Sequence, residues 1–178
     1  VTNFESAADD FVLDGFVFSE EAGFENKAMH SSHPYPDFED VTAVPRTPVR
    51  VDENYPILSF DEIALVEAGK ADALFGSEDF YDYVIIEGSL NSGLTWQPLA
   101  DGYDVRYSDN WTPEADLTQP PALSQFVNHQ IDLMNTFSAG DEVLIRFRMN
   151  SDNAVAGWGW VVDNLRIQSE LLTSTASE

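Results

Sequence analysis

The chain contains no cysteine, few basic residues and no long apolar run. Without cysteine it can form no disulfide, thiolate metal site or thiol nucleophile. Only 8 lysines and arginines oppose 32 aspartates and glutamates, so the formal net charge is −24. Because such a surface repels phosphate backbones and anionic lipids, we expect no nucleic-acid partner. No apolar run is long enough to cross a bilayer, so we expect no membrane insertion either.

Several catalytic signatures are also missing. The sequence has no Gly-x-Ser-x-Gly elbow and no glycine-rich phosphate loop. Lys27 and Lys70 are the only lysines, which leaves few candidates for Schiff-base chemistry. His30, His33 and Asp37 in "HSSHPYPD" could bind zinc, but no His-Glu-x-x-His helix is present and the prolines imply a loop. We interpret these histidines as packing or capping groups.

What remains is the composition of a folded domain. Of 178 residues, 43% are hydrophobic and 12% aromatic, which fits one domain with a sizeable core. The opening stretch "VTNFESAADDF" does not have the pattern of a signal peptide. We therefore expect a mature protein or a module of a longer one. The tail "LLTSTASE" is typical of a linker or terminus, so the predicted domain spans 1–169 and the predicted tail spans 170–178.

Alternation of apolar and polar residues is the main structural signal. In "DEVLIRFRM", every second residue from Val143 to Met149 is apolar, whereas Arg146 and Arg148 lie on the opposite face. One buried face and one wet face indicate a strand of an antiparallel sheet. Segments 53–67, 80–89 and 157–167 have similar patterns, with Asn-Ser-Gly or Ala-Gly-Asp turns nearby.

These runs predict an all-β fold, an antiparallel β-sandwich of the jelly-roll type with few or no helices. The best helix candidate is 121–134, although its apolar residues also fit an extended strand. Residues 68–79 form a long predicted loop between two strands, which is a candidate binding loop.

An acid interrupts the last predicted strand, "GWGWVVDNLRI". If the chain is extended there, Asp163 lies on one face with Val161, Leu165 and Ile167, the face expected to be buried. A buried carboxylate is costly unless something compensates its charge. The residues alone leave three compensators open: a bound cation, an arginine, or backbone N–H groups.

Two long stretches together resemble a known family. These are "FYDYVIIEGSLNSGLTWQPL" and "AGDEVLIRFRMNSDNAVAGWGWVVDNLRI", preceded by "NFE" and "YPILSF". Their order is similar to that of MAM-like jelly-roll modules that accompany immune-inhibitor-A-type metallopeptidases, and of adhesin domains of secreted Bacteroidota proteins. The resemblance covers about residues 4–167.

The resemblance implies a structural calcium ion bound by Glu5 and Asp163, on first and last strands that lie side by side. Calcium takes oxygen ligands and would compensate Asp163. Asp61 is a further candidate ligand because it shares a face with Ile63 and Leu65. Asp9 and Asp10 are plausible additions.

The resemblance also implies function: a non-catalytic accessory module, secreted or at the cell surface, beside other domains of a larger chain. Its expected partner is an extracellular polysaccharide or a surface protein. Two alternatives stay open, an adhesion domain that contacts protein and a polysaccharide-degrading enzyme. The enzyme would use acids on a concave sheet face, with Glu62 and Glu87 as candidates.

Aromatic residues indicate where a ligand could bind. Trp111 lies in the polar loop "YSDNWTPEAD", with Tyr103 and Tyr107 nearby. Exposed rings of this kind can stack on sugars, whereas buried rings serve only as core. We predict the ligand-binding residues to be Trp111, Tyr103 and Tyr107.

Overall fold

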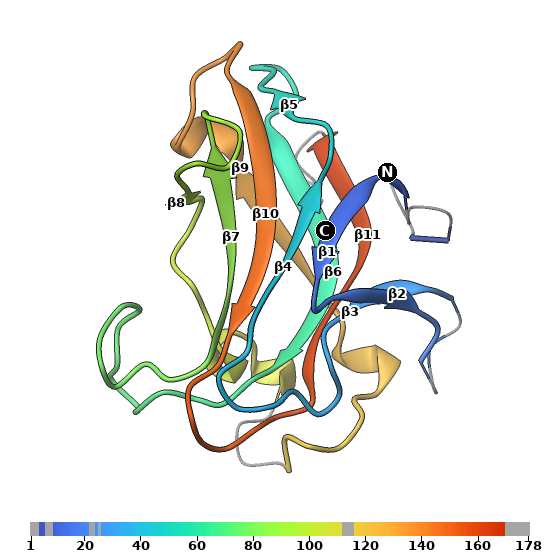
Figure 1. The fold of residues 1–178 in the computed structure, drawn as a ribbon, viewed down its shortest axis with the longest axis vertical. Coiled ribbons are helices and arrows are strands. Elements are labelled where there is room, and N and C mark those ends of the chain that lie inside the picture. Colours follow the sequence, from blue (N-terminus) through green and yellow to red (C-terminus); the bar gives the residue numbers. More distant parts are fainter. Residues whose placement is uncertain (1–3, 6–8, 22–23, 25, 112–115, 170–178) are drawn as a thin grey trace, which may run out of the picture.

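The computed structural model describes residues 4–5, 9–21, 24, 26–111 and 116–169. It is a sandwich of two antiparallel sheets, which confirms the predicted fold class (Figure 1). The elements in chain order are β1 (Phe11–Asp14), β2 (Val17–Ser19), β3 (Ala28–His30), β4 (Asp40–Pro45), β5 (Val49–Arg50), β6 (Ile57–Leu65), β7 (Tyr83–Ser89), β8 (Gln97–Pro98), β9 (Val127–Asp132), β10 (Glu142–Asn150) and β11 (Gly159–Ser169).

The two sheets interleave strands from the whole chain. The front sheet of Figure 1 has the order β1-β4-β10-β7-β8, with β5 beside β10. The back sheet has the order β2-β3-β11-β6-β9. The implied first and last strands are therefore not neighbours: β1 pairs with β4, whereas β11 pairs with β3 and β6.

Helical structure is minimal in the described residues. It consists of 3₁₀ turns of three residues each at Val105–Tyr107 (η2), Asp109–Trp111 (η3), Leu123–Gln125 (η4) and Leu133–Asn135 (η5). The helix expected over 121–134 is wrong, because that segment forms η4 and then β9. Its apolar residues pack into the sandwich, which favours the extended conformation. No helix in the described part is long and apolar enough to cross a membrane.

The core lies between the sheets. Alternate residues of β10 are buried, as predicted, and Phe147 contacts Phe60 of β6 at 5.4 Å between ring centroids. Trp160 of β11 packs against the same Phe147 at 5.9 Å. Glu62 has the same orientation as Phe60, so it points into the sandwich and is fully buried.

A β-bulge in β11 separates Asp163 from two of the three residues predicted to share its face. Its register with β6 shifts between Asp163 and Arg166, and Asn164 has a φ of 50°. Asp163 pairs with Asp61 on the outer face, whereas Ile167 pairs with Leu58, whose side chain points inward. The prediction that Asp163 shares a face with Leu165 and Ile167 is therefore wrong, because the bulge inserts one residue and inverts the alternation.

Candidate functional site

The acids predicted to bind calcium do lie in one region. Asp163 is 7% exposed, and its Oδ1 accepts a hydrogen bond from the Asn164 backbone N–H at 2.7 Å. Burial raises the pKa of Asp163, and the nearby charges of Asp61 and Glu5 raise this pKa further. Asp163 takes part in no ion pair within the described residues. Of the compensators considered, the backbone N–H is therefore present and the arginine is not.

Amide groups hold the two neighbouring carboxylates. The Lys27 backbone N–H donates to Glu5 Oε1 at 2.8 Å. Asp61 accepts hydrogen bonds from Asn128 Nδ2 at 2.8 Å and from Asn164 Nδ2 at 3.0 Å. The oxygens of Glu5, Asp61 and Asp163 do not all approach within 4.8 Å of one another. The region is thus an oxygen-rich, negatively charged patch that suits a hard cation but has an open geometry.

The three predicted ligand-binding aromatics form one chain of ring contacts but differ in exposure. Tyr107 lies 4.5 Å from Tyr103 and 5.7 Å from Trp111, between ring centroids. Trp111 is fully buried, with its indole N–H donated to the Gln125 carbonyl at 2.9 Å. Tyr103 is also buried, whereas Tyr107 is 49% exposed. Of the three, Tyr107 offers the accessible ring surface.

Tyr107 rests on a buried polar network. Its ring stacks on His129 at 4.9 Å and 6°. His129 Nδ1 donates to Glu62 at 2.7 Å, and Trp160 Nε1 donates to the same carboxylate at 2.7 Å. The Tyr103 hydroxyl also donates to Glu62, at 2.7 and 2.8 Å. Glu62 thus anchors three side chains beneath a cavity of about 290 Å³ that Tyr103 and Tyr107 line with Phe80 and Arg106.

The enzyme alternative required Glu62 and Glu87 on one concave face. Glu62 points into the sandwich from the back sheet, whereas Glu87 lies on the outer face of the front sheet with Arg146. The two carboxylates therefore cannot form a catalytic pair, and this part of the prediction is wrong. Both faces of β6 are mostly apolar, so its sequence could not indicate which side was concave.

The two histidines pack as interpreted, although His30 ends β3 and does not lie in a loop. His33 Nδ1 donates to the Trp158 carbonyl at 2.7 Å, and its ring stacks on Trp158 at 3.6 Å. Since His33 Nε2 is then an acceptor, His30 Nδ1 donates to it at 2.9 Å. Burial, together with His33, lowers the pKa of His30 to about 3. Both rings are therefore packing groups, and neither joins a carboxylate cluster in the described residues.

The outer face of the front sheet carries a polar arrangement that sequence reasoning missed. Arg146 donates to Glu87 at 2.8 Å, and its guanidinium lies over the Trp96 ring at 4.3 Å. One row along β10, Arg148 makes two hydrogen bonds to Asp40, at 2.6 and 2.8 Å. Alternation placed both arginines on the wet face, but their partners come from distant strands.

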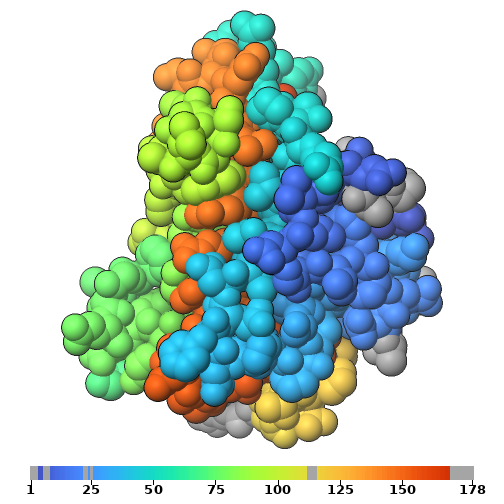
Figure 2. Space-filling model, in the orientation of Figure 1, coloured from blue at the N-terminus to red at the C-terminus, as the bar shows by residue number. Residues whose placement is uncertain are grey.

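We use the name β10 cleft for a cavity at one end of this face of β10 together with the arginine pairs beside it. Figure 2 shows β10 (orange) as a narrow band between the green segment of β7 and β8 and the cyan segment of β5. At one end the floor residue Leu144 lies in a cavity of about 210 Å³, with Pro48 on one wall and Ser89 and Leu90 on the other. The arginine pairs lie farther along the same face of β10.

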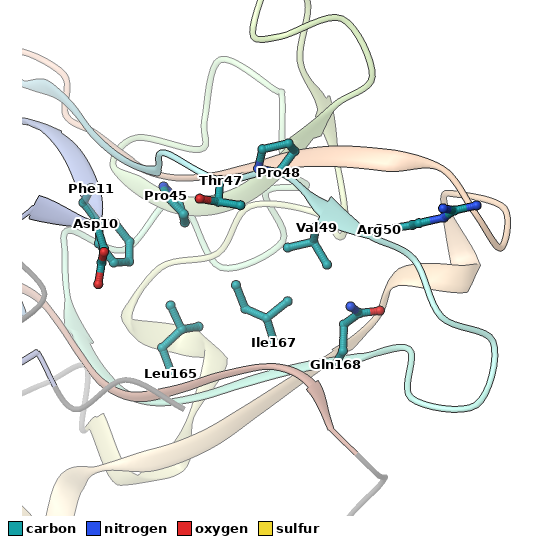
Figure 3. A pocket seen from close by; sticks show the side chains of 10 residues that line it. All are labelled: Asp10, Phe11, Pro45, Thr47, Pro48, Val49, Arg50, Leu165, Ile167 and Gln168. Carbon is teal, nitrogen blue, oxygen red and sulfur yellow. The ribbon is translucent and has the colours of Figure 1, made fainter.

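A larger cavity of about 450 Å³ lies beside β5 and the end of β11 (Figure 3). Val49 and Ile167 face each other across it, and Leu165 adds to its apolar wall. Asp10 lies toward one end, and Arg50 and Gln168 toward the other. The cavity thus has an apolar centre and polar side chains in the rest of its lining, among them Thr47.

Comparison with known proteins gives a fold but no family. No family model matches the chain, and no curated protein matches it. The resemblance to MAM-like and immune-inhibitor-A-associated modules is therefore not supported by a family match. The jelly-roll-like sandwich that it implied is confirmed.

Eighteen chains of solved structures match. One is a non-crystalline-cellulose-specific carbohydrate-binding module, CBM28, with 12% identity, TM-score 0.54 and coverage of 90% of this chain and 88% of that chain. Another is TmCBM27, studied for specific mannan recognition, with 14% identity, TM-score 0.47 and coverage of 96% and 95%. The third is the glycoside hydrolase domain of Endo-D from Streptococcus pneumoniae R6, with 11% identity, TM-score 0.47 and coverage of 88% and 20%. At these identities, the CBM28 likeness establishes the sandwich fold alone.

Proposed function

We propose that this protein is a non-catalytic carbohydrate-binding module that holds a neutral polysaccharide in the β10 cleft. The observation that carries the proposal is the ordered row formed by Trp96, Arg146 and Glu87. Sugars are recognised by aromatic surfaces together with hydrogen-bonding groups held in fixed positions. A fold match to a module that binds cellulose adds support.

Ion pairing prepares the cleft for hydroxyl groups. Glu87 orients Arg146 and Asp40 orients Arg148, so each guanidinium enters binding with little rotational freedom left to lose. Each pair retains N–H donors and carboxylate lone pairs that can meet sugar hydroxyls. Because both cations are already neutralised and the chain carries a net charge of −24, an anionic polysaccharide is disfavoured.

The absence of catalysis belongs to the same proposal. Glu87, the buried acid of this face, already engages its carboxylate with Arg146. Glycoside hydrolysis needs a second carboxyl group that shares the bond to be cleaved. Asp40 is itself paired with Arg148, whose hydrogen bonds lower the pKa of Asp40 although partial burial raises it.

We extend the proposal to the calcium ion and to location. Glu5, Asp61 and Asp163 would hold a structural calcium ion, since their oxygens suit a hard cation; the ion would offset the repulsion of their charges and draw their oxygens closer together than they lie in this structure. The module would act in a secreted protein or at a cell surface, beside other domains. An adhesion role is the competing proposal, with a protein in place of the sugar.

Isothermal titration calorimetry with cellohexaose and mannohexaose tests the site. We expect Trp96→Ala and Arg146→Ala each to weaken binding at least 10-fold, about 1.4 kcal/mol. Tyr107→Ala is the matched aromatic control and should leave affinity unchanged. If Tyr107→Ala abolishes binding and Trp96→Ala does not, the ligand lies in the tyrosine-lined cavity instead. If neither neutral nor acidic oligosaccharides bind, the carbohydrate proposal is wrong.

A further inference from the structure

Three carboxylates converge where β6 and β10 end and β7 begins; Figure 1 shows these strand ends together at the lower end of the sandwich. Glu67 follows β6, Asp82 precedes β7 and Asp152 follows β10, so three distant segments meet there. One oxygen from each lies within 4.8 Å of the others. We call these residues the Glu67 cluster. It contains none of the residues of the Asp163 region or of the β10 cleft.

A buried tyrosine builds the inner wall of the cluster. Tyr35 is 2% exposed and donates its hydroxyl to Asp82 Oδ2 at 2.5 Å. The same hydroxyl accepts the Glu67 backbone N–H at 3.0 Å. Asp82 Oδ1 accepts the Asp152 backbone N–H at 2.7 Å. Asp82 is itself fully buried, so the fold holds this part of the cluster in a fixed position.

Glu67 has one carboxylate oxygen whose hydrogen-bonding capacity is unused. Glu67 Oε2 is buried away from solvent and has no hydrogen-bond partner. None of the three acids forms an ion pair within the described part of the chain. Burial, followed by the charges of Asp82 and Asp152, raises the pKa of Glu67 to about 7. Buried charges in proteins are paired or coordinate a metal, and here no protein cation is available among the described side chains.

The chemistry of the donors favours calcium. All three side chains offer carboxylate oxygens, which hard cations prefer, whereas zinc prefers nitrogen or sulfur ligands. Magnesium demands a near-ideal octahedron and usually keeps several waters, whereas calcium accepts an irregular set of protein oxygens.

We propose that Glu67, Asp82 and Asp152 bind a calcium ion, separate from any ion at Asp163. The ion would join the ends of β6, β7 and β10, and so tie the two sheets together at this end. Carbonyl groups or water would complete its coordination, because calcium takes six to eight oxygens. The inference does not depend on carbohydrate binding.

Calcium stoichiometry tests the site directly. Chelator-treated full chain is titrated with calcium chloride by calorimetry, together with Glu67→Gln, Asp152→Asn, Asp163→Asn and the exposed-acid control Glu53→Gln. We expect Glu67→Gln and Asp152→Asn each to lose one bound calcium per chain or to weaken one site at least 10-fold. Asp163→Asn and Glu53→Gln should retain that site.

A fold control accompanies the titration. Circular dichroism should show Glu67→Gln folded, because the substitution relieves repulsion at a partly exposed position. Its melting temperature without calcium should equal or exceed that of the parent chain, and calcium should raise it less. If Glu67→Gln and Asp152→Asn bind as many calcium ions as the parent with equal affinity, the proposal is overturned. It is also overturned if the parent binds no calcium at this position. Protonation of the acids would then be what relieves their repulsion.

Discussion

Replacing Glu62 removes the single acceptor that three buried side chains share. The donors are Tyr103, His129 and Trp160, at 2.7–2.8 Å from the carboxylate. Leucine at this position keeps much of the volume but accepts no hydrogen bond. Each buried donor left unsatisfied costs about 1–3 kcal/mol, so Glu62→Leu should lose roughly 3–9 kcal/mol of unfolding free energy. This is a large part of the roughly 5–15 kcal/mol of a typical domain.

Glutamine at position 62 separates the hydrogen bonds from the charge. Its oxygen can face Trp160, which only donates, while its NH₂ faces His129, whose ring nitrogen can become an acceptor by a change of tautomer. We therefore expect Glu62→Gln to lose only about 1–3 kcal/mol, mainly the charge-assisted part of the bonds. The order Leu, then Gln, then parent in increasing stability is the signature of a shared acceptor.

Urea unfolding followed by tryptophan fluorescence measures these differences. Glu53→Leu, on an exposed acid, is the control and should stay within about 0.5 kcal/mol of the parent. If Glu62→Leu unfolds at the same urea concentration as the parent, the network has no energetic importance and the assignment is refuted. If Glu62→Leu fails to fold, the Glu62→Gln midpoint still decides the matter.

Three further outcomes are expected. Burial lowers the pKa of His30 to about 3, below its ordinary 6.5, so below pH 6.5 the unfolded chain binds a proton that the folded chain does not bind. In urea titrations, the stability advantage of the parent over His30→Gln should therefore shrink by about 2 kcal/mol from pH 7.5 to pH 5. A constant difference would contradict this. Gly88→Ala should lose about 1–3 kcal/mol in the same assay, because a Cβ there would lie 2.6 Å from Phe137 atoms; an unchanged midpoint would mean that Phe137 can move aside. Chelator should lower the unfolding free energy of the parent more than that of Asp163→Asn, by up to the roughly 2.7 kcal/mol that a site at 100 times its Kd supplies. Melting temperatures with and without chelator measure this difference, and equal shifts would mean that no calcium binds at that position.

The strands were predictable because their side chains alternate. In β10, the period of two is interrupted by neither glycine nor proline, and its buried and wet faces are those expected. Segment 121–134 was ambiguous since Ile131 and Leu133 fit either period, and only packing against the sandwich selects the strand. The burial of Asp163 was predicted correctly, but Leu165 and Ile167 were placed on the wrong face relative to it. The reason is that Asn164, which adopts positive φ, looks like any other strand residue in the sequence.

The site was only partly predictable, because the sequence does not show which strands are neighbours or how they are aligned. Glu5 was predicted from the family resemblance and Asp61 from the face that it shares with Ile63 and Leu65, and the charges of both do act on the pKa of Asp163. The pairing of Arg146 with Glu87 and Trp96 depends on which strands are neighbours and on how they align, and neither can be read from one chain. The Glu67 cluster was missed for the same reason, since its members come from the ends of three strands.

Direct titration of neutral oligosaccharides against the parent chain and Trp96→Ala tests the central claim most simply. The account predicts measurable binding of a β-linked glucan or mannan hexasaccharide by the parent, at least 10-fold weaker binding by Trp96→Ala, and unchanged binding by Tyr107→Ala. Equal affinity of the parent and Trp96→Ala for every oligosaccharide that binds would contradict it.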